Sequence, residues 1–185
     1  VDGAREIMGM GLNKLGYSLN DSNPSHIKRA EVDLKKLAPQ VRGVVGDEIT
    51  MMLQQNEGNI AVVWSGVAAP LVQNSNKYDY VIPKEGSNLW FDNMVIPKTA
   101  QNKEGAYKFM NFLLDKKNNK QNTEWVGYAT PNKAARDKLP KEIREDHRFY
   151  PTNKEQKRLE VYKDLGQQTL SEYNESFLNF KMTLK

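Results

Sequence analysis

Short apolar runs alternate with amphipathic helical patterns along this chain, and this alternation restricts the possible folds more than any other feature. The run NIAVVWSG at residues 59–66 is rich in β-branched residues and predicts a strand that is buried on both faces. YDYVIPKEG at 78–86 and LWFDNMVIP at 89–97 predict two further strands. Strands interspersed with helices are typical of an α/β fold. Three strands are few for 185 residues, so we expect part of the sheet to lie upstream of Val1.

Amphipathic patterns predict the helices. Asp2 is placed to cap a helix that ends at Gly16, and Pro24 begins a second helix that ends before Pro39. The later helical patterns are a short one at 47–58, a strongly periodic one at 102–118, one at 120–127, two pieces at 132–146 divided by Pro140, and a long tail helix at 157–185. In the pattern at 102–118 the apolar residues share one side: Ala106, Phe109, Met110, Phe112 and Leu113.

Composition excludes several kinds of site. The chain has no cysteine, which excludes disulfides, thiolate metal sites and a cysteine nucleophile. Its two histidines, His26 and His147, lie far apart in polar surroundings, so we expect no metal site. No apolar run reaches the roughly 18 residues that a membrane-spanning helix needs. The net charge of +4 comes from lysines and arginines interspersed with acids and amides, so we expect solvated helix faces and no nucleic-acid binding.

Motifs for catalysis are also missing from the sequence. It has no G-x-S-x-G nucleophile turn, no phosphate-binding loop and no H-E-x-x-H zinc motif. Its acidic pairs do not fall in a recognisable catalytic setting. We therefore predict a binding protein without a cofactor rather than an enzyme.

Aromatic and acidic residues at the ends of the predicted elements are the candidates for a binding site. Trp64 closes the first predicted strand, and Trp90 begins the third with Asp92 on the same face. Tyr128 follows a helix end, and Glu6 lies in the first turn of the first helix. Ring faces attract organic cations, and carboxylates accept their N–H bonds. Core packing of the tryptophans, a satisfied acid in a turn and a helix-dipole role for Glu6 are the alternative interpretations.

Five segments carry a resemblance that favours the first interpretation: DGAREIMGMGLNKLGYSLND, NIAVVWSG, IPKEGSNLWFDNMVIP, NKEGAYKFMNFLLD and GYATPNKAAR. Together, and in this order over nearly the whole chain, they resemble the bacterial spermidine/putrescine-binding proteins. These proteins are the extracytoplasmic receptors of polyamine ABC importers. The stretch 83–97 and the G-Y-x-T-P-N run at 127–132 are the most specific parts.

The resemblance implies an α/β, periplasmic-binding-protein-like fold of type II, in which two lobes close on the ligand. This chain would be its C-terminal portion. By analogy, 1–90 and 137–185 belong to the C-terminal lobe, and 91–136 crosses into the N-terminal lobe, whose remainder lies upstream. The implied partners are a polyamine and the membrane permease of the importer. The whole protein would be a monomer, free in a periplasm or lipid-anchored on the outer face of the membrane.

The resemblance also implies a set of ligand contacts. Trp64 and Trp90 match aromatic walls along the methylenes of the polyamine. Asp92 matches an acid that binds an ammonium group, and Glu6 matches another such acid near a helix start. Tyr128 matches a tyrosine that lines the cleft.

Two departures from the family pattern concern the same site. The family often has a second acid three residues before the glutamate, where this chain has Gly3. Asp2 is a further candidate for that acid, although helix capping is its plainer role. A cleft glutamine of the family corresponds approximately to Tyr162, which would stack on the ligand rather than donate to it. Both departures are expected to alter the preference between putrescine and spermidine.

Two other functions remain as alternatives. A receptor of the same fold for another solute, such as an anion or a sugar, would need arginines or helix N-termini rather than acids at the ligand. A basic module that binds nucleic acid would show strongly salt-dependent affinity.

Overall fold

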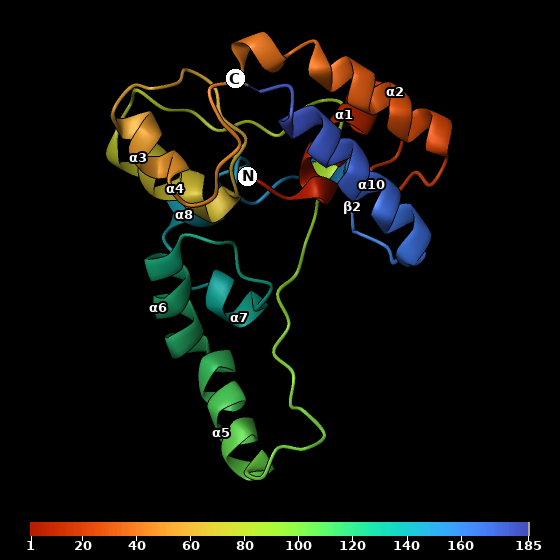
Figure 1. Cartoon of the computed structure of the whole chain (residues 1–185). Helices are drawn as coiled ribbons and strands as arrows, with labels where there is room; N and C mark the ends of the chain where they lie inside the picture. The colour runs from red at the N-terminus through yellow and green to blue at the C-terminus, as the bar shows by residue number, and fades with distance from the viewer. Residues whose placement is uncertain (185) are drawn as a thin grey trace. The chain divides into compact units, whose positions relative to one another are not determined.

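The computed structural model describes residues 1–184 and groups them into two compact units (Figure 1). The first unit comprises Val1–Trp64, Ile82–Trp90 and the chain from Asn153 onward. The second unit comprises Ser65–Val81 and Phe91–Thr152. The chain therefore passes from one unit to the other four times.

The lobe ranges of the whole protein, 1–90 with 137–185 and 91–136, stay a prediction. One unit boundary falls between Trp90 and Phe91, and the last falls after Thr152. Lys185, where the expected tail helix ends, lies outside the described residues.

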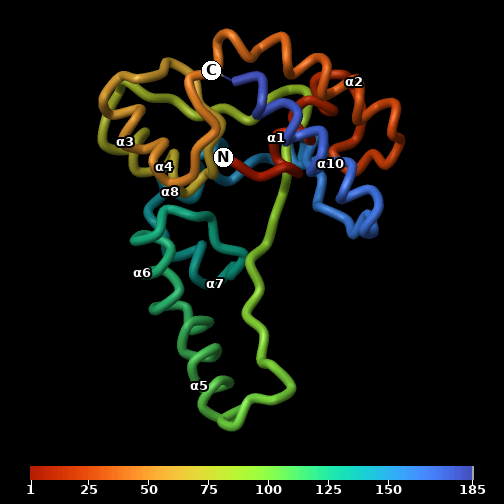
Figure 2. The backbone as a smooth tube through the Cα atoms, viewed as in Figure 1, coloured from red at the N-terminus to blue at the C-terminus, as the bar shows by residue number. Residues whose placement is uncertain are grey.

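Three helices form the core of the first unit: α1 (Ala4–Lys14), α2 (Pro24–Lys35) and α10 (Gly166–Lys181). They lie side by side in Figures 1 and 2. Their apolar faces meet in one buried cluster: Ile7, Met8, Leu12, Ile27, Ala30, Leu34, Tyr173 and Phe180. The periodicity of the sequence thus predicted the first two helices correctly.

The ends of α1 and α2 follow local sequence rules, with one correction. Gly16 takes a left-handed φ of 80° after α1, and Asn23 caps α2 by accepting from Ser25 N at 2.9 Å. The cap of α1, however, is Gly3, and no side chain supplies a capping hydrogen bond. The capping role predicted for Asp2 is therefore wrong, because the helix begins one residue later than expected.

The sheet is much smaller than the sequence predicts. β1 (Ser87–Asn88) pairs in parallel with β2 (Leu159–Glu160), as an α/β fold requires. The predicted strands at 59–66, 78–86 and 89–97 are wrong for residues 1–184, where these segments carry no strand. A strand forms only where a neighbour takes its N–H and C=O groups. Leu89 N donates to Glu160 O of β2, but no strand lies beside the rest of these segments among residues 1–184. Ile60 accordingly remains 93% exposed.

The remaining elements match the predicted helices in part. The predicted patterns correspond to α3 (Ile49–Gln54), α5 (Lys103–Leu114), α6 (Lys116–Val126), α7 (Lys133–Arg136) and α8 (Lys141–Arg144). The sequence did not predict α4 (Ser65–Asn74), a turn of 3-10 helix (Ala38–Gln40) or α9 (Asn153–Gln156). The single tail helix is wrong, because the tail first forms β2 and α10 begins only at Gly166.

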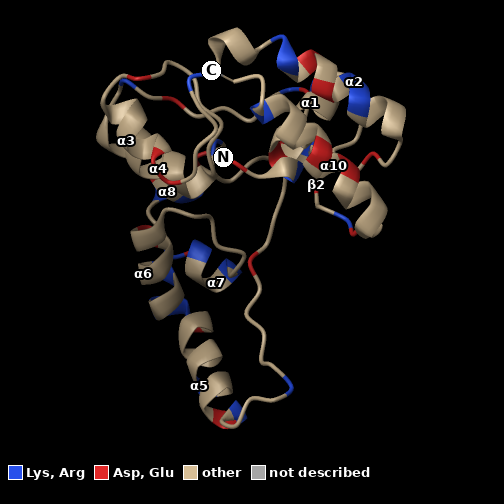
Figure 3. Ribbon diagram, in the orientation of Figure 1, with Lys and Arg blue, Asp and Glu red and all other residues tan. Residues whose placement is uncertain are grey.

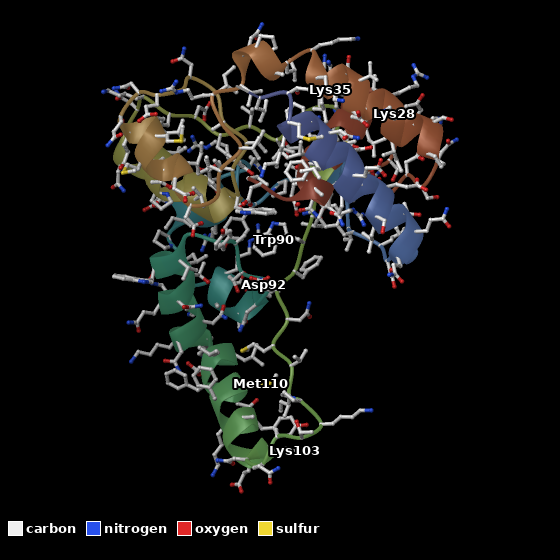
Figure 4. The ribbon with its side chains drawn as sticks, in the orientation of Figure 1. Lys28, Lys35, Trp90, Asp92, Lys103 and Met110 are labelled. Carbon is white, nitrogen blue, oxygen red and sulfur yellow. The ribbon has the colours of Figure 1, made fainter. Side chains whose placement is uncertain are left out.

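The apolar side of α5 is not covered by the described residues. The helix buries none of its side chains, and Phe109 and Phe112 are 59% and 58% exposed. Met110, labelled in Figure 4, is half-buried. No helix within 1–184 is both long enough and apolar enough to cross a membrane.

A buried carboxylate joins α2 to α10. The Glu31 side chain is 1% exposed, and Lys28 and Lys35 reach it with Nζ–Oε distances of 2.9 and 2.7 Å. Figure 3 shows that α2 carries both acidic and basic residues, and Figure 4 labels the two lysines. Burial alone raises the pKa of Glu31, but hydrogen bonds from Lys35, Lys28 and Ser176 outweigh burial and lower it. Because this pKa is lowered, the stabilisation is present above the ordinary pKa of 4.5 and is lost as the pH falls through the lowered value.

We expect Glu31→Gln to lower the free energy of unfolding by about 1–3 kcal/mol at pH 7, because a buried charged acceptor is lost. Urea denaturation measures this loss, and the difference between parent and variant should shrink below pH 4.5. Glu104→Gln is the matched control, since its pair with Lys108 spans 2.7 Å between exposed side chains. The control should cost less than about 0.5 kcal/mol. Equal losses in the two variants would contradict the role of Glu31.

Candidate functional site

Two tryptophans that are far apart in sequence meet in the first unit. The ring centroids of Trp64 and Trp90 are 5.6 Å apart at an interplanar angle of 73°, an edge-to-face pair. Both side chains are half-buried, so part of each ring remains accessible. The segment of Trp90 is anchored by Leu89 N, which donates to Glu160 O at 2.9 Å. Near Trp64, Val62 O accepts a hydrogen bond from Val1 N at 3.3 Å.

Glu6 lies in the first turn of α1, and its carboxylate folds back over Gly3. A Cβ at position 3 would coincide with Glu6 Oε2 and lie 2.7 Å from Cδ. The backbone of Gly3, at φ −84° and ψ 139°, suits any residue. The atoms that a Cβ would meet belong to the end of the flexible Glu6 side chain, so a larger residue at position 3 would displace that carboxylate. The neighbouring Asp2 is exposed and lies outside the helix.

Tyr162 lies close to Glu6, in the loop between β2 and α10. Burial raises the pKa of the Tyr162 hydroxyl, and the negative charge of Glu6 raises it further. The guanidinium of Arg5 lies over the Tyr162 ring, with Cζ 4.6 Å from its centroid. The first unit therefore gathers Glu6 and Tyr162 around the start of α1, with Arg5 as a neighbour that the sequence did not single out.

Asp92 belongs to the second unit and is exposed (Figure 4). Its segment runs extended toward α5 without forming a strand (Figure 2). The shared strand face predicted for Trp90 and Asp92 is therefore wrong in this chain, since that alternation holds only for a strand. The assignment of Asp92 to a ligand rests on the resemblance and stays a prediction.

Tyr128 is positioned by two glycines of the second unit. Gly127 ends α6 in the left-handed conformation, with φ 75°, and so turns the chain toward Tyr128. The Tyr128 ring packs on Gly66 in the first turn of α4, where a Cβ would lie 2.5 Å from ring atom Cζ. Tyr80 lies close enough that Tyr128 contributes to its raised pKa, of which burial is the larger cause.

The T-P-N part of the specific run at 127–132 holds the Tyr128 loop. Thr130 Oγ1 donates to Asn119 Oδ1 at 2.6 Å, and Thr130 N donates to the hydroxyl of Tyr150 at 3.3 Å. Asn132 caps α7 by accepting from Ala135 N at 3.2 Å, and its amide donates to Leu114 O at 2.8 Å. Sequence analysis missed these roles, although an Asn before a helical pattern is a recognisable cap. Among residues 1–184, no three His, Asp or Glu side chains gather as a metal site requires.

Comparison with known proteins identifies the family. Residues 2–151 match the sequence profile of the family described as bacterial extracellular solute-binding protein. The chain belongs to this family. Its extracellular description agrees with the predicted extracytoplasmic location.

Several similar proteins carry polyamine names. The chain is 42% identical over 166 residues to the spermidine/putrescine-binding periplasmic protein of Escherichia coli (strain K12), covering 90% of this chain and 48% of that protein. A solved chain from Listeria monocytogenes, described as a spermidine/putrescine ABC transporter, is 56% identical with a TM-score of 0.91, over 98% of this chain and 56% of that one. A substrate-binding protein for spermidine/putrescine from Streptococcus pneumoniae is 46% identical with a TM-score of 0.88, over 100% and 57% of the two chains.

These likenesses confirm the predicted α/β, periplasmic-binding-protein-like fold. They also show that the chain spans about half the length of the relatives it matches. The relatives are named as binding and transport proteins, not as enzymes.

Gly66→Ala tests how Tyr128 is held. The added methyl would collide with the Tyr128 ring, so we expect a loss of about 1–3 kcal/mol in the free energy of unfolding, measured by urea denaturation. Gly58→Ala is the control, because nothing lies within 4 Å of a Cβ there. It should change stability by less than about 0.5 kcal/mol. A Gly66→Ala protein as stable as the control would contradict the packing of Tyr128 on α4.

Proposed function

We propose that the protein containing this chain is the extracytoplasmic receptor of a polyamine ABC importer. It binds spermidine or putrescine without chemical change and delivers the ligand to a membrane permease. The proposal assigns Trp64, Trp90 and Glu6 of the first unit to the ligand, together with Asp92 and Tyr128 of the second. Asp2 and Tyr162 are further candidates, and the receptor acts as a monomer.

The observation that carries the proposal is the edge-to-face pair of Trp64 and Trp90. Two accessible indole rings 5.6 Å apart offer two π-faces to an organic cation or to its methylenes. Simple core packing would bury both rings, whereas both are half-exposed. Polyamines are cationic at neutral pH, because alkylammonium groups titrate near pH 10, as lysine does.

The contacts supply enough binding free energy for micromolar affinity only if the assigned residues of both units contribute. A ring–cation contact gives roughly 0.5–2 kcal/mol, and a charged hydrogen bond gives about 1.5–3 kcal/mol. Three rings and two acids therefore supply on the order of 5–12 kcal/mol before the cost of association. Micromolar affinity needs about 8 kcal/mol. Glu6 and Asp92 are thus both needed, and the loss of either acid should weaken binding measurably.

Tryptophan fluorescence of the full-length protein tests the proposal. Trp125 is 88% exposed on α6 and would add a constant background, so the titration uses a Trp125→Phe protein. We expect spermidine and putrescine to change the emission of Trp64 and Trp90 and to saturate at micromolar concentration. Asp92→Asn should weaken binding roughly 10- to 100-fold, because one charged hydrogen bond is lost.

Asp47→Asn is the matched control, since Asp47 is also an exposed acid and lies outside the assigned set. It should leave the affinity unchanged. An emission that responds to an anion or a neutral sugar and not to amines would mean a receptor for another solute. An unchanged affinity in Asp92→Asn would remove Asp92 from the site.

A further inference from the structure

Glu160 of β2 is hydrogen-bonded to two segments that are far apart in sequence. Its carboxylate accepts from Ser18 Oγ and, at 3.1 Å, from Leu19 N, both in the loop between α1 and α2. Its backbone oxygen accepts from Leu89 N at 2.9 Å, and Leu89 directly precedes Trp90. Glu160 therefore connects the α1–α2 loop to the segment that carries Trp90.

The loop that Glu160 meets is fixed by the core of the first unit. Leu19 is 2% exposed, and its oxygen lies 3.3 Å from the hydroxyl of the fully buried Tyr173. The same hydroxyl donates to Asp21 O at 2.7 Å. The Glu160 carboxylate is therefore bonded to a part of the chain that cannot shift without disturbing the core.

The strand pair next to Trp90 is too short to position a ring by itself. Two residue pairs join β1 to β2, Ser87 with Leu159 and Asn88 with Glu160. Even a complete two-stranded hairpin is only marginally stable in water, so a ladder of this length needs contacts outside it. The side-chain bonds of Glu160 supply such contacts.

Gly86 brings the start of β1 close to β2. Its φ of 126° is a positive value that residues with a side chain disfavour, and a Cβ there would lie 2.9 Å from Arg158 O, just before β2. From Gly86 to Leu89 the backbone therefore lies directly against the β2 segment. A shift of β2 would move Leu89 and the neighbouring Trp90 with it.

We propose that Glu160 is the positioning residue of Trp90. Its side chain holds β2 on the α1–α2 loop, and β2 in turn holds the Trp90 ring edge-to-face with Trp64, at a centroid distance of 5.6 Å. Glu160 does not contact the ligand. It preorganises the two indoles and so lowers the cost of ordering them on binding. This inference rests on the proposed function, which assigns both rings to the ligand.

Circular dichroism and isothermal titration of the full-length protein test the inference. Coupling between the two indole transitions gives a far-ultraviolet couplet that depends on the distance and angle between the rings. Subtracting the spectrum of the same protein with Trp64→Phe isolates this couplet. Glu160→Ala removes both side-chain acceptors, so we expect a smaller couplet and putrescine binding weakened roughly 3- to 10-fold, because part of a ring contact is lost. A purely structural role would lower stability but leave the couplet and affinity of the folded variant unchanged, which would overturn the inference.

Glu160→Gln separates positioning from direct contact with the ligand. The amide oxygen can accept from Leu19 N and the amide nitrogen can donate to Ser18 Oγ, so the position of Trp90 should survive the loss of charge. The couplet should be retained, and the Kd for putrescine should stay within about twofold of the parent, since both hydrogen bonds remain. A variant that keeps the couplet but loses as much affinity as Glu160→Ala would mean that the carboxylate binds the ligand itself, and the inference would be overturned.

Glu175→Ala is the matched control, because Glu175 is an exposed acid of α10 in the same unit and lies outside these contacts. It should leave the couplet and the affinity unchanged, and losses equal to those of Glu160→Ala would contradict the role of Glu160.

Ser18→Ala provides a second measurement in case Glu160→Ala does not fold. Ser18 is exposed, and its substitution removes one of the two side-chain bonds. The couplet and the affinity should change in the same direction by a smaller amount. A Ser18→Ala protein with neither change would overturn the inference.

The two proposals fail in different ways. A parent protein that binds no amine refutes the proposed function, while the couplet of Glu160→Ala still tests the position of Trp90. A parent that binds amines, with an unchanged couplet in folded Glu160→Ala, refutes the positioning role alone.

Discussion

The first unit depends on one fully buried side chain, Tyr173 of α10. Its hydroxyl lies 2.7 Å from Asp21 O and 3.3 Å from Leu19 O, so it satisfies the loop that joins α1 to α2. Burial, as the largest cause, raises the pKa of Tyr173 to about 12, and the phenol therefore stays a donor at any physiological pH. The same ring supports the guanidinium of Arg5. Tyr173 thus contacts the core, the α1–α2 loop and Arg5.

What the sequence predicted correctly is local. The helical period predicted α1 and α2, whose Ile7, Leu12 and Leu34 lie in the core, and glycine and proline marked helix ends, because these signals act within a few residues. Glu31 and Tyr173 could not be predicted in their roles. A buried glutamate on a charged helix looks like any surface acid until the lysines and the serine that meet it are known. Contacts between distant segments decide such cases.

The three incorrectly predicted strands also have a physical explanation, since strand pairing depends on contacts between distant segments. The apolar run at 59–64 predicts that these residues are covered in the folded protein. It does not predict which segment covers them. The described residues leave Ile60 and Val95 largely exposed and leave the apolar side of α5 uncovered. The fold class could therefore be predicted while the strand pairs could not.

For the candidate site, too, the sequence indicated several residues, while their contacts could be seen only in the fold. Aromatic and acidic residues at element ends pointed to Trp64, Trp90 and Glu6, and the structure brings the two tryptophans together. Arg5 gave no signal, because an arginine beside a glutamate in a first helical turn is an ordinary surface pattern. Only the fold shows that its guanidinium lies on the rings of Tyr162 and Tyr173 and is held by Asn20. Contacts between segments this far apart in sequence leave no local pattern from which they could be predicted.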